Sequence, residues 1–139
     1  MNNNKDNLNQ ITSLINDAGG HCDYGGNESE LDYLIDTAQS KYPDKGVCAV
    51  KNWVWWDLDV DEKGQQYFAS RCVHPSIIYA KYVIWDKFNR WPQGSYAKTT
   101  LLFNFEEECF FITTNTVYIL VGPGTRKTVA PDLVASIQF

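Results

Sequence analysis

Hydrophobic residues recur at helical spacing in the first third of the chain and at alternating spacing after it. One helical stripe ends at Ala18-Gly19-Gly20 and predicts a short amphipathic helix with its apolar side chains at Leu8, Ile11, Leu14 and Ile15. A second stripe begins at Asn27, which suits a capping box with Glu30, and stops before Pro43. Its apolar positions predict a second helix and are Leu31, Leu34, Ile35, Ala38 and Tyr42.

From Cys48 onward the period changes to two, which is typical of a strand. One predicted face consists of apolar residues, interrupted at Asn52, and contains Cys48, Val50, Val54, Trp56, Leu58 and Val60. The opposite face is mixed and contains Lys51, Trp53, Trp55, Asp57, Asp59 and Asp61. A turn is predicted at Asp61-Glu62-Lys63-Gly64, followed by a weak strand from Tyr67 to Val73.

The second half of the chain predicts further strands. Residues Ile77 to Asp86 are apolar on both faces for much of their length, as expected for a central strand. In the next run the residues expected to point inward are Thr99, Leu101, Phe103 and Phe105. Two shorter strands are predicted over Cys109 to Thr113 and Val117 to Val121, and Gly122-Pro123-Gly124 then predicts a turn. A short helix is predicted from Pro131.

This order of elements predicts an α+β fold. We expect two N-terminal helices packed on a curled antiparallel sheet, or a small barrel, of about five or six strands. The 139 residues fit a single domain over 1–139, in which residues 1–5 are expected to be disordered.

The charge and hydrophobicity of the chain disfavour several classes of function. With 12 basic and 17 acidic residues the net charge is −5, which disfavours direct binding to nucleic acid. No apolar run approaches the ~20 residues that span a bilayer, so we expect no membrane partner. The start of the chain has no apolar leader region, which predicts a cytoplasmic protein whose four cysteines are free thiols.

Many residues between about 47 and 129 resemble a family of small uncharacterised bacterial proteins associated with prophages and other mobile elements. In the first half they are Cys48-Ala-Val-Lys-Asn-Trp53, Asp57-Leu58, Ile77-Ile-Tyr-Ala80, Val83-Ile84, Asp86, Arg90 and Gly94. In the second half they are Leu101-Leu102, Phe105, Cys109, Phe111, Thr113, Asn115-Thr-Val-Tyr118, Leu120, Gly122-Pro-Gly124 and Arg126-Lys127. The resemblance implies a mobile-element accessory protein that acts on a host defence complex or another host machine, and it brings no assigned activity.

Aromatic and acidic residues form the strongest candidate for a protein-binding surface. Aromatic side chains are enriched at interface hot spots, and carboxylates steer basic partners. The candidates are Trp53, Trp55, Asp57, Asp59, Asp61, Glu62, Glu106 and Glu107. The alternative is that helices cover the two tryptophans as part of the core.

Two smaller sites have weaker support. The segment from Gly122 to Lys127 offers backbone amides and two cations to an anion through Gly122, Gly124, Arg126 and Lys127. A metal would need four N and S ligands, and the candidates are His21, Cys22, Cys72 and His74, whose spacing lacks the usual Cys-x-x-Cys.

Two functional hypotheses follow. In the first, the protein is not an enzyme and binds a host protein or protein complex, without a cofactor. In the second, it is a small ligand- or metal-binding enzyme that uses the His21/Cys22 loop or the Gly122–Lys127 turn. We favour the first because no nucleophile, base and orienting group occur together. Edge strands also leave a homodimer open.

Overall fold

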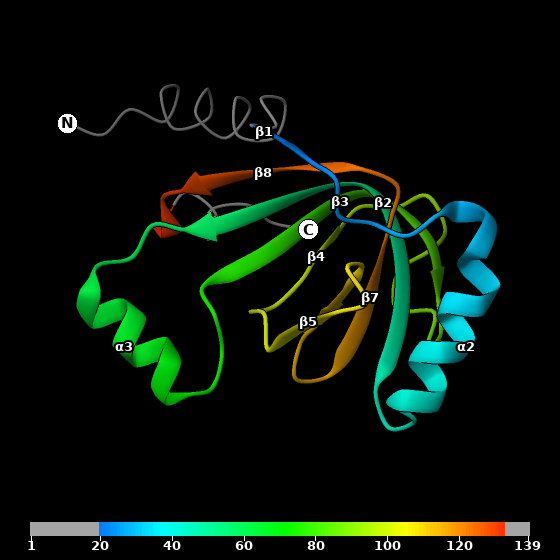
Figure 1. Cartoon of the computed structure of the whole chain (residues 1–139), viewed down its shortest axis with the longest axis horizontal. Coiled ribbons are helices and arrows are strands. Elements are labelled where there is room, and N and C mark those ends of the chain that lie inside the picture. The colour runs from blue at the N-terminus through cyan, green and yellow to red at the C-terminus, as the bar shows by residue number, and fades with distance from the viewer. Residues whose placement is uncertain (1–19, 133–139) are drawn as a thin grey trace.

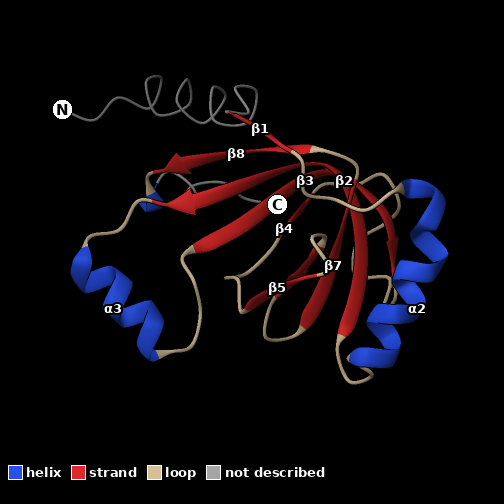
Figure 2. Ribbon diagram, in the orientation of Figure 1, coloured by secondary structure: helices blue, strands red, loops and turns tan. Residues whose placement is uncertain are grey.

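The computed structural model describes residues 20–132, which form one curled, half-barrel sheet with a helix at each end (Figures 1 and 2). The eight strands are β1 (Gly20–Cys22), β2 (Gly46–Leu58), β3 (Ser76–Asp86), β4 (Ala97–Lys98), β5 (Asn104–Glu106), β6 (Phe110–Ile112), β7 (Thr116–Val121) and β8 (Gly124–Val129). The helices are a 3-10 turn η1 (Glu28–Glu30), which leads into α2 (Leu31–Lys41), and α3 (Glu62–Ser70).

The predicted arrangement of two N-terminal helices on an antiparallel sheet is wrong. The first predicted helix, the expected disorder of residues 1–5 and most of the helix predicted from Pro131 lie outside the described residues. Within residues 20–132, the second predicted helix, now η1 and α2, packs on the sheet through Leu34 and Ala38. Asn27 caps it as expected, because its side-chain oxygen accepts a hydrogen bond from the Ser29 amide.

The sheet is mixed, because the longest strand has parallel neighbours. Antiparallel pairing, as predicted, joins β2 to β3, β5 to β6 and β6 to β7. Strand β2, however, runs parallel to β7 in its first half and parallel to β8 in its second half. This arrangement arises because β7 and β8 are consecutive in the chain and both run in the same direction as β2.

The predicted turn at Gly122-Pro123-Gly124 is therefore wrong, and the segment is a bulge within one long course of the chain. Lys51 pairs with Val121 and Val54 pairs with Thr125, so two residues of β2 face three residues of the opposite strand. Gly122 has a φ of 70°, which glycine adopts without strain. Figure 1 shows β2 and the β7–β8 course changing direction together at this level, which curls the sheet.

Asn52 changes which residues of β2 share a face. Its φ is 55°, in the left-handed region that asparagine tolerates better than most residues. The two-residue period therefore slips by one, and Trp53 and Trp55 join Cys48 and Val50 in one cluster of buried side chains. The predicted faces of this strand are correct before Asn52 and reversed after it, because periodicity assumes an unbroken pleat.

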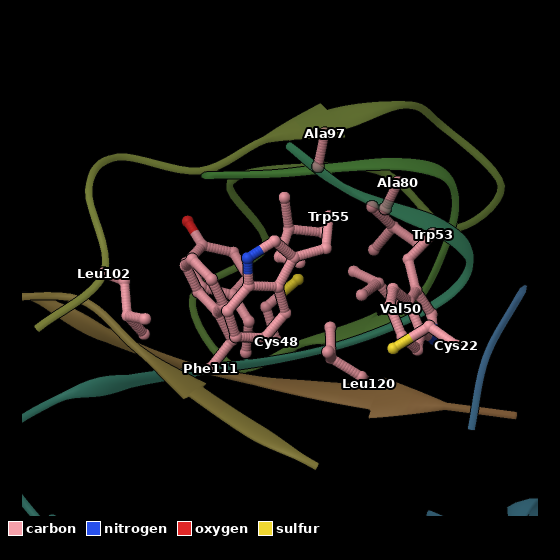
Figure 3. Close-up of a cluster of buried hydrophobic side chains, with 13 residues drawn as sticks. Cys22, Cys48, Val50, Trp53, Trp55, Ala80, Ala97, Leu102, Phe111 and Leu120 are labelled. Atoms are coloured by element: carbon pink, nitrogen blue, oxygen red, sulfur yellow. The ribbon is translucent and has the colours of Figure 1, made fainter. Parts of the chain in front are cut away.

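Both faces of the sheet are buried, in three clusters. The largest lies on the inner side of the curl, where Trp55 and Phe111 pack edge to face with ring centroids 5.0 Å apart (Figure 3). A second cluster joins α2 to Val47, Ala49 and strands β6 and β7. The third lies where Trp56 stacks on Tyr79, with ring centroids 5.2 Å apart.

Helix α3 replaces the turn and weak strand predicted between Asp61 and Val73. Asp61 starts the helix, because its Oδ1 accepts a hydrogen bond of 2.8 Å from the Gly64 amide. None of the α3 side chains is buried, and Figure 1 shows the helix projecting from the end of the sheet between β2 and β3.

The strand predicted over Thr99 to Phe105 is also wrong. Strand β4 ends at Lys98 and β5 begins at Asn104, so most of the predicted span lies between them, and Phe103, expected to point inward, is 45% exposed.

Candidate functional site

The two tryptophans of the predicted aromatic and acidic surface are buried. Trp53 is 1% exposed and Trp55 is 3% exposed, so the alternative of core packing describes their positions. The indole Nε1 of Trp53 donates a hydrogen bond of 2.9 Å to the carbonyl of Gly122. An ideal Cβ on Gly124 would lie 2.4 Å from the Trp53 ring, so this glycine leaves the space that the indole occupies.

Asp57 holds an internal ion pair at the rim of the inner cluster. Its carboxylate accepts hydrogen bonds from Arg126 Nε at 2.6 Å, Ser76 Oγ at 2.8 Å and Trp55 Nε1 at 3.0 Å. Burial of the carboxyl opposes ionisation, but the hydrogen bonds from Arg126 and Ser76 outweigh it and hold the pKa of Asp57 below its usual value. Arg126 also lies 4.7 Å from the Trp55 ring centroid.

This ion pair changes the interpretation of the predicted anion site. Arg126 is engaged by Asp57 and Trp55 on the inner side of the sheet. Gly122 and Gly124 form the bulge beside Trp53, and Lys127 lies opposite Trp56 in the β2–β8 pairing. The four residues therefore do not converge as a turn around one ligand.

The remaining predicted carboxylates are divided between two places. Asp59, Asp61 and Glu62 are exposed where β2 leads into α3. Glu106 lies on the other side of the fold, where Lys41 Nζ is 2.7 Å from its Oε1. The adjacent Glu107 is exposed and has a φ of 56°.

Glu106 has three polar partners. Besides Lys41, its Oε2 accepts hydrogen bonds from Tyr42 Oη at 2.8 Å and Asn104 Nδ2 at 2.7 Å. The hydrogen bond from Lys41 is the main reason that the pKa of Glu106 is lowered. Glu106 therefore ties the end of α2 to strand β5.

The metal-ligand candidates do not form a cluster. Between residues 20 and 132, no three histidine, cysteine, aspartate or glutamate side chains lie close enough together to hold an ion. Cys22 is buried in the inner cluster, while Cys72 is exposed after α3. His21 is instead exposed, with its Nε2 hydrogen-bonded to Oδ1 of Asp23 at 2.6 Å.

The sequence reasoning missed a groove at the α3 end of the sheet. It has a volume of about 610 Å³, within the ~300–1,000 Å³ range of ligand pockets. Its apolar wall comes from five separate segments and consists of Leu58, Val73, Ile77, Leu101 and Pro131, with Arg71 and Lys98 among its polar residues. No local pattern connects these positions, because folding alone brings them together.

A further ion pair joins Asp86, at the end of β3, to Arg90 in the loop that follows. The side chain of Asp86 is fully buried and accepts hydrogen bonds from the Arg90 amide at 2.5 Å and from Arg90 Nη2 at 2.8 Å. Arg90 Nη1 donates in turn to Thr116 Oγ1 at 2.8 Å, so the loop after β3 is attached to β7. We assign this pair a structural role.

Comparison with known proteins places the chain in a family. A family model described as a domain of unknown function, DUF6957, matches residues 24–136. The chain belongs to the DUF6957 family. The match begins before the region of resemblance predicted from the sequence and includes α2 and the segment that precedes it. No curated protein and no solved structure matches the chain.

The extent of the DUF6957 match agrees with the packing of its first residues. Gly25 and Gly26 lie against the bulge, where the Gly122 amide donates to the Gly26 carbonyl at 2.9 Å. A Cβ on Gly25 would lie 2.0 Å from the carbonyl oxygen of Gly122. The segment at the start of the match is thus part of the same bend in the sheet.

In the described portion of the DUF6957 domain, neither helix has the length and apolar character needed to cross a membrane.

The four cysteines of the chain are expected to differ sharply in reactivity. Burial raises the pKa of Cys48 to about 12 and that of Cys109 to about 11, so both thiols stay protonated and covered at neutral pH. Cys22 is also buried, whereas Cys72 is exposed. We expect a thiol reagent to label one cysteine per native chain quickly and the other three only after unfolding.

Mass spectrometry of trypsin fragments after brief labelling would identify the modified residue. A Cys72→Ser variant is the control and should show no rapid labelling. Rapid modification of Cys48 or Cys109 in the native protein would contradict the packing of the sheet.

Proposed function

We propose that this protein is a binding domain for another protein, and that it works through the groove and helix α3 at one end of the sheet. The observation that carries the proposal is an apolar groove beside a helix that buries none of its side chains. Tyr67 on this helix is 53% exposed. An exposed apolar surface with a polar rim is typical of interaction sites.

The acidic residues near the groove favour a partner that carries basic residues. Leu58 lines the groove, and the next residues along the chain include the exposed carboxylates of Asp59, Asp61 and Glu62. A linear segment with apolar side chains would fill the groove, and basic residues beside them would meet the carboxylates. The fold supports such docking because β2 and β3 are firmly paired below α3.

The sequence resemblance extends this proposal to a biological setting. In a mobile element, the partner would be a host protein or protein complex, including one that serves in defence. The groove and α3 support the proposed binding surface whether or not the protein belongs to a mobile element.

The proposal predicts that changes in the groove abolish partner capture while changes outside it do not. Leu101 lines the groove, and Leu101→Glu would place a charge against its apolar wall. Phe103 is two residues away and outside the groove, so Phe103→Glu is the matched control. We expect affinity purification from a bacterial lysate, quantified by mass spectrometry, to lose the partner with Leu101→Glu alone.

The charged edge is tested separately. Asp59→Lys with Glu62→Lys should weaken capture by about tenfold or more, because it opposes a basic partner, and the loss should shrink at high salt. Asp61 is left unchanged because it caps α3. Asp32→Lys with Asp36→Lys on α2 is the control of equal charge change. The same set of captured proteins from all four variants would refute the proposed surface.

A further inference from the structure

A second hollow lies beside the bulge, away from the groove and α3. It has a volume of about 470 Å³ and forms where β2 and the β7–β8 course separate. Asn52 and Val54 border it on one strand, and Pro123, Gly124 and Thr125 border it on the other. The hollow exists because regular pairing stops between Lys51 and Val54, so neither strand fills the space with a continuous ladder.

A cation without a protein partner lines this hollow. Lys81 on β3 is only partly exposed, and its ammonium makes no hydrogen bond or ion pair within residues 20–132. His21 on β1 lines the same space from the other side. Its Nε2 lies 2.6 Å from Oδ1 of Asp23.

A buried hydroxyl also points to a missing partner. Thr125 Oγ1 is excluded from solvent and makes no hydrogen bond, which is unusual because buried polar groups are nearly always satisfied. Such a hydroxyl costs free energy unless a ligand or a water molecule meets it. Thr125 follows Gly124, the residue whose missing side chain makes room for Trp53.

We propose that this hollow binds the phosphate group of a small molecule. Lys81 supplies the charge, and the Asn52 carboxamide and the Thr125 hydroxyl supply neutral donors. The volume exceeds that of a free phosphate and leaves space for a small organic group attached to it. Arg126, which the sequence suggested for an anion, is engaged by Asp57 instead.

The binding test uses inorganic phosphate and glycerol 3-phosphate as probes. We expect saturable shifts of the amide resonances of Asn52, Val54, Lys81 and Thr125 in NMR spectra of the full chain. Sodium chloride at matched ionic strength should not reproduce them. Glycerol 3-phosphate should bind at least as tightly as inorganic phosphate. Saturable binding of acetate with equal affinity would overturn the assignment to phosphate, as would the absence of saturable shifts.

Two variants separate binding from a structural effect. Lys81→Met should weaken phosphate binding about tenfold, whereas Lys87→Met, on a lysine that lies over Phe88 instead, should not. Thr125→Val preserves the shape of the side chain and should weaken binding several-fold. If Thr125→Val raises stability and leaves phosphate affinity unchanged, the hydroxyl is merely unsatisfied and the proposed site is wrong. This outcome would leave the protein-binding groove untouched, because the two sites share no residue.

Discussion

Trp53→Ala is expected to lower the free energy of unfolding by about 3–5 kcal/mol, the range for truncating a buried tryptophan. The indole is 1% exposed, and its Nε1 donates to the Gly122 carbonyl at 2.9 Å. The substitution would leave a cavity at the point where β2 and the β7–β8 course bend together. Urea unfolding followed by far-UV circular dichroism would measure the loss.

Gly124→Ala tests the same contact from the opposite side. Its new Cβ would lie 2.4 Å from the Trp53 ring, and overpacking of this kind costs about 1–3 kcal/mol. Gly20→Ala is the matched control, because the nearest atom to its Cβ is 3.9 Å away. The double variant of Trp53 and Gly124 should lose less than the sum of the single losses. Strict additivity would mean that the two residues do not share the space that the structure gives them.

Asp86→Ala is expected to lower the free energy of unfolding by about 3 kcal/mol, the low end of the range for breaking a buried ion pair. The carboxylate is fully buried, but the Arg90 side chain is 33% exposed, so water compensates part of its lost partner. The substitution also removes the acceptor for the Arg90 amide. Asp59→Ala, at an exposed carboxylate of similar sequence context, should change stability by no more than about 0.5 kcal/mol.

Acid should weaken the same pair. Burial opposes ionisation of Asp86, but hydrogen bonds from Arg90 outweigh it and lower the pKa of the folded carboxyl. A carboxyl with a lowered folded pKa stabilises the protein above its unfolded pKa of about 3.9, and this stabilisation is lost as the pH falls through the folded pKa. The pKa of Asp57 is also lowered in the folded protein, so protonation of Asp57 at low pH should destabilise the fold as well.

The acid dependence has its own control. Urea midpoints of the wild type should fall as the pH is lowered from about 5 toward 2. Asp86→Asn keeps the shape of the side chain but does not titrate, so its midpoint should fall less steeply. Equal slopes for the wild type and Asp86→Asn would mean that Asp86 has the same pKa in the folded and unfolded chain.

The architecture separates the parts that hold the fold from the parts proposed to bind. Strand β2 pairs with three neighbours and carries most of the buried tryptophans. The groove and α3 lie at its C-terminal end, and the proposed phosphate site lies at the bend near its middle. Ile77 belongs to the third buried cluster and lines the groove, and Leu101 packs against the same cluster, so the free energy of unfolding of each groove variant should be measured together with its binding.

Several elements were predictable because the signals that define them are local. The helical stripe after Asn27 became η1 and α2, since a cap and periodic apolar residues suffice to place a helix. The mostly apolar run of Ile77 to Asp86, interrupted by Lys81, became β3, a central strand buried along most of its length. Antiparallel hairpin partners of β6 and β7 also followed from their short connections.

The failures concern residues whose conformation depends on distant neighbours. Asn52 reverses the faces of β2 because its left-handed conformation fits the bulge at Gly122–Gly124, about 70 residues later, and no local pattern records that pairing. Gly-Pro-Gly was interpreted as a turn because the same residues serve both purposes. Asp61 was a usable helix signal, since aspartate is a good N-cap, but the turn interpretation took precedence.

The sequence by itself determined the helix that begins after Asn27, the strand-rich second half of the chain and the net acidic charge. These properties depend on composition and on spacing between near neighbours. The tertiary structure alone decided that β2 runs parallel to β7 and β8, that Trp53 and Trp55 are core residues, and that five separate segments enclose the groove. The physical reason is that burial and strand pairing depend on contacts between residues far apart in the chain. The sequence around either residue does not show which distant residue it will contact.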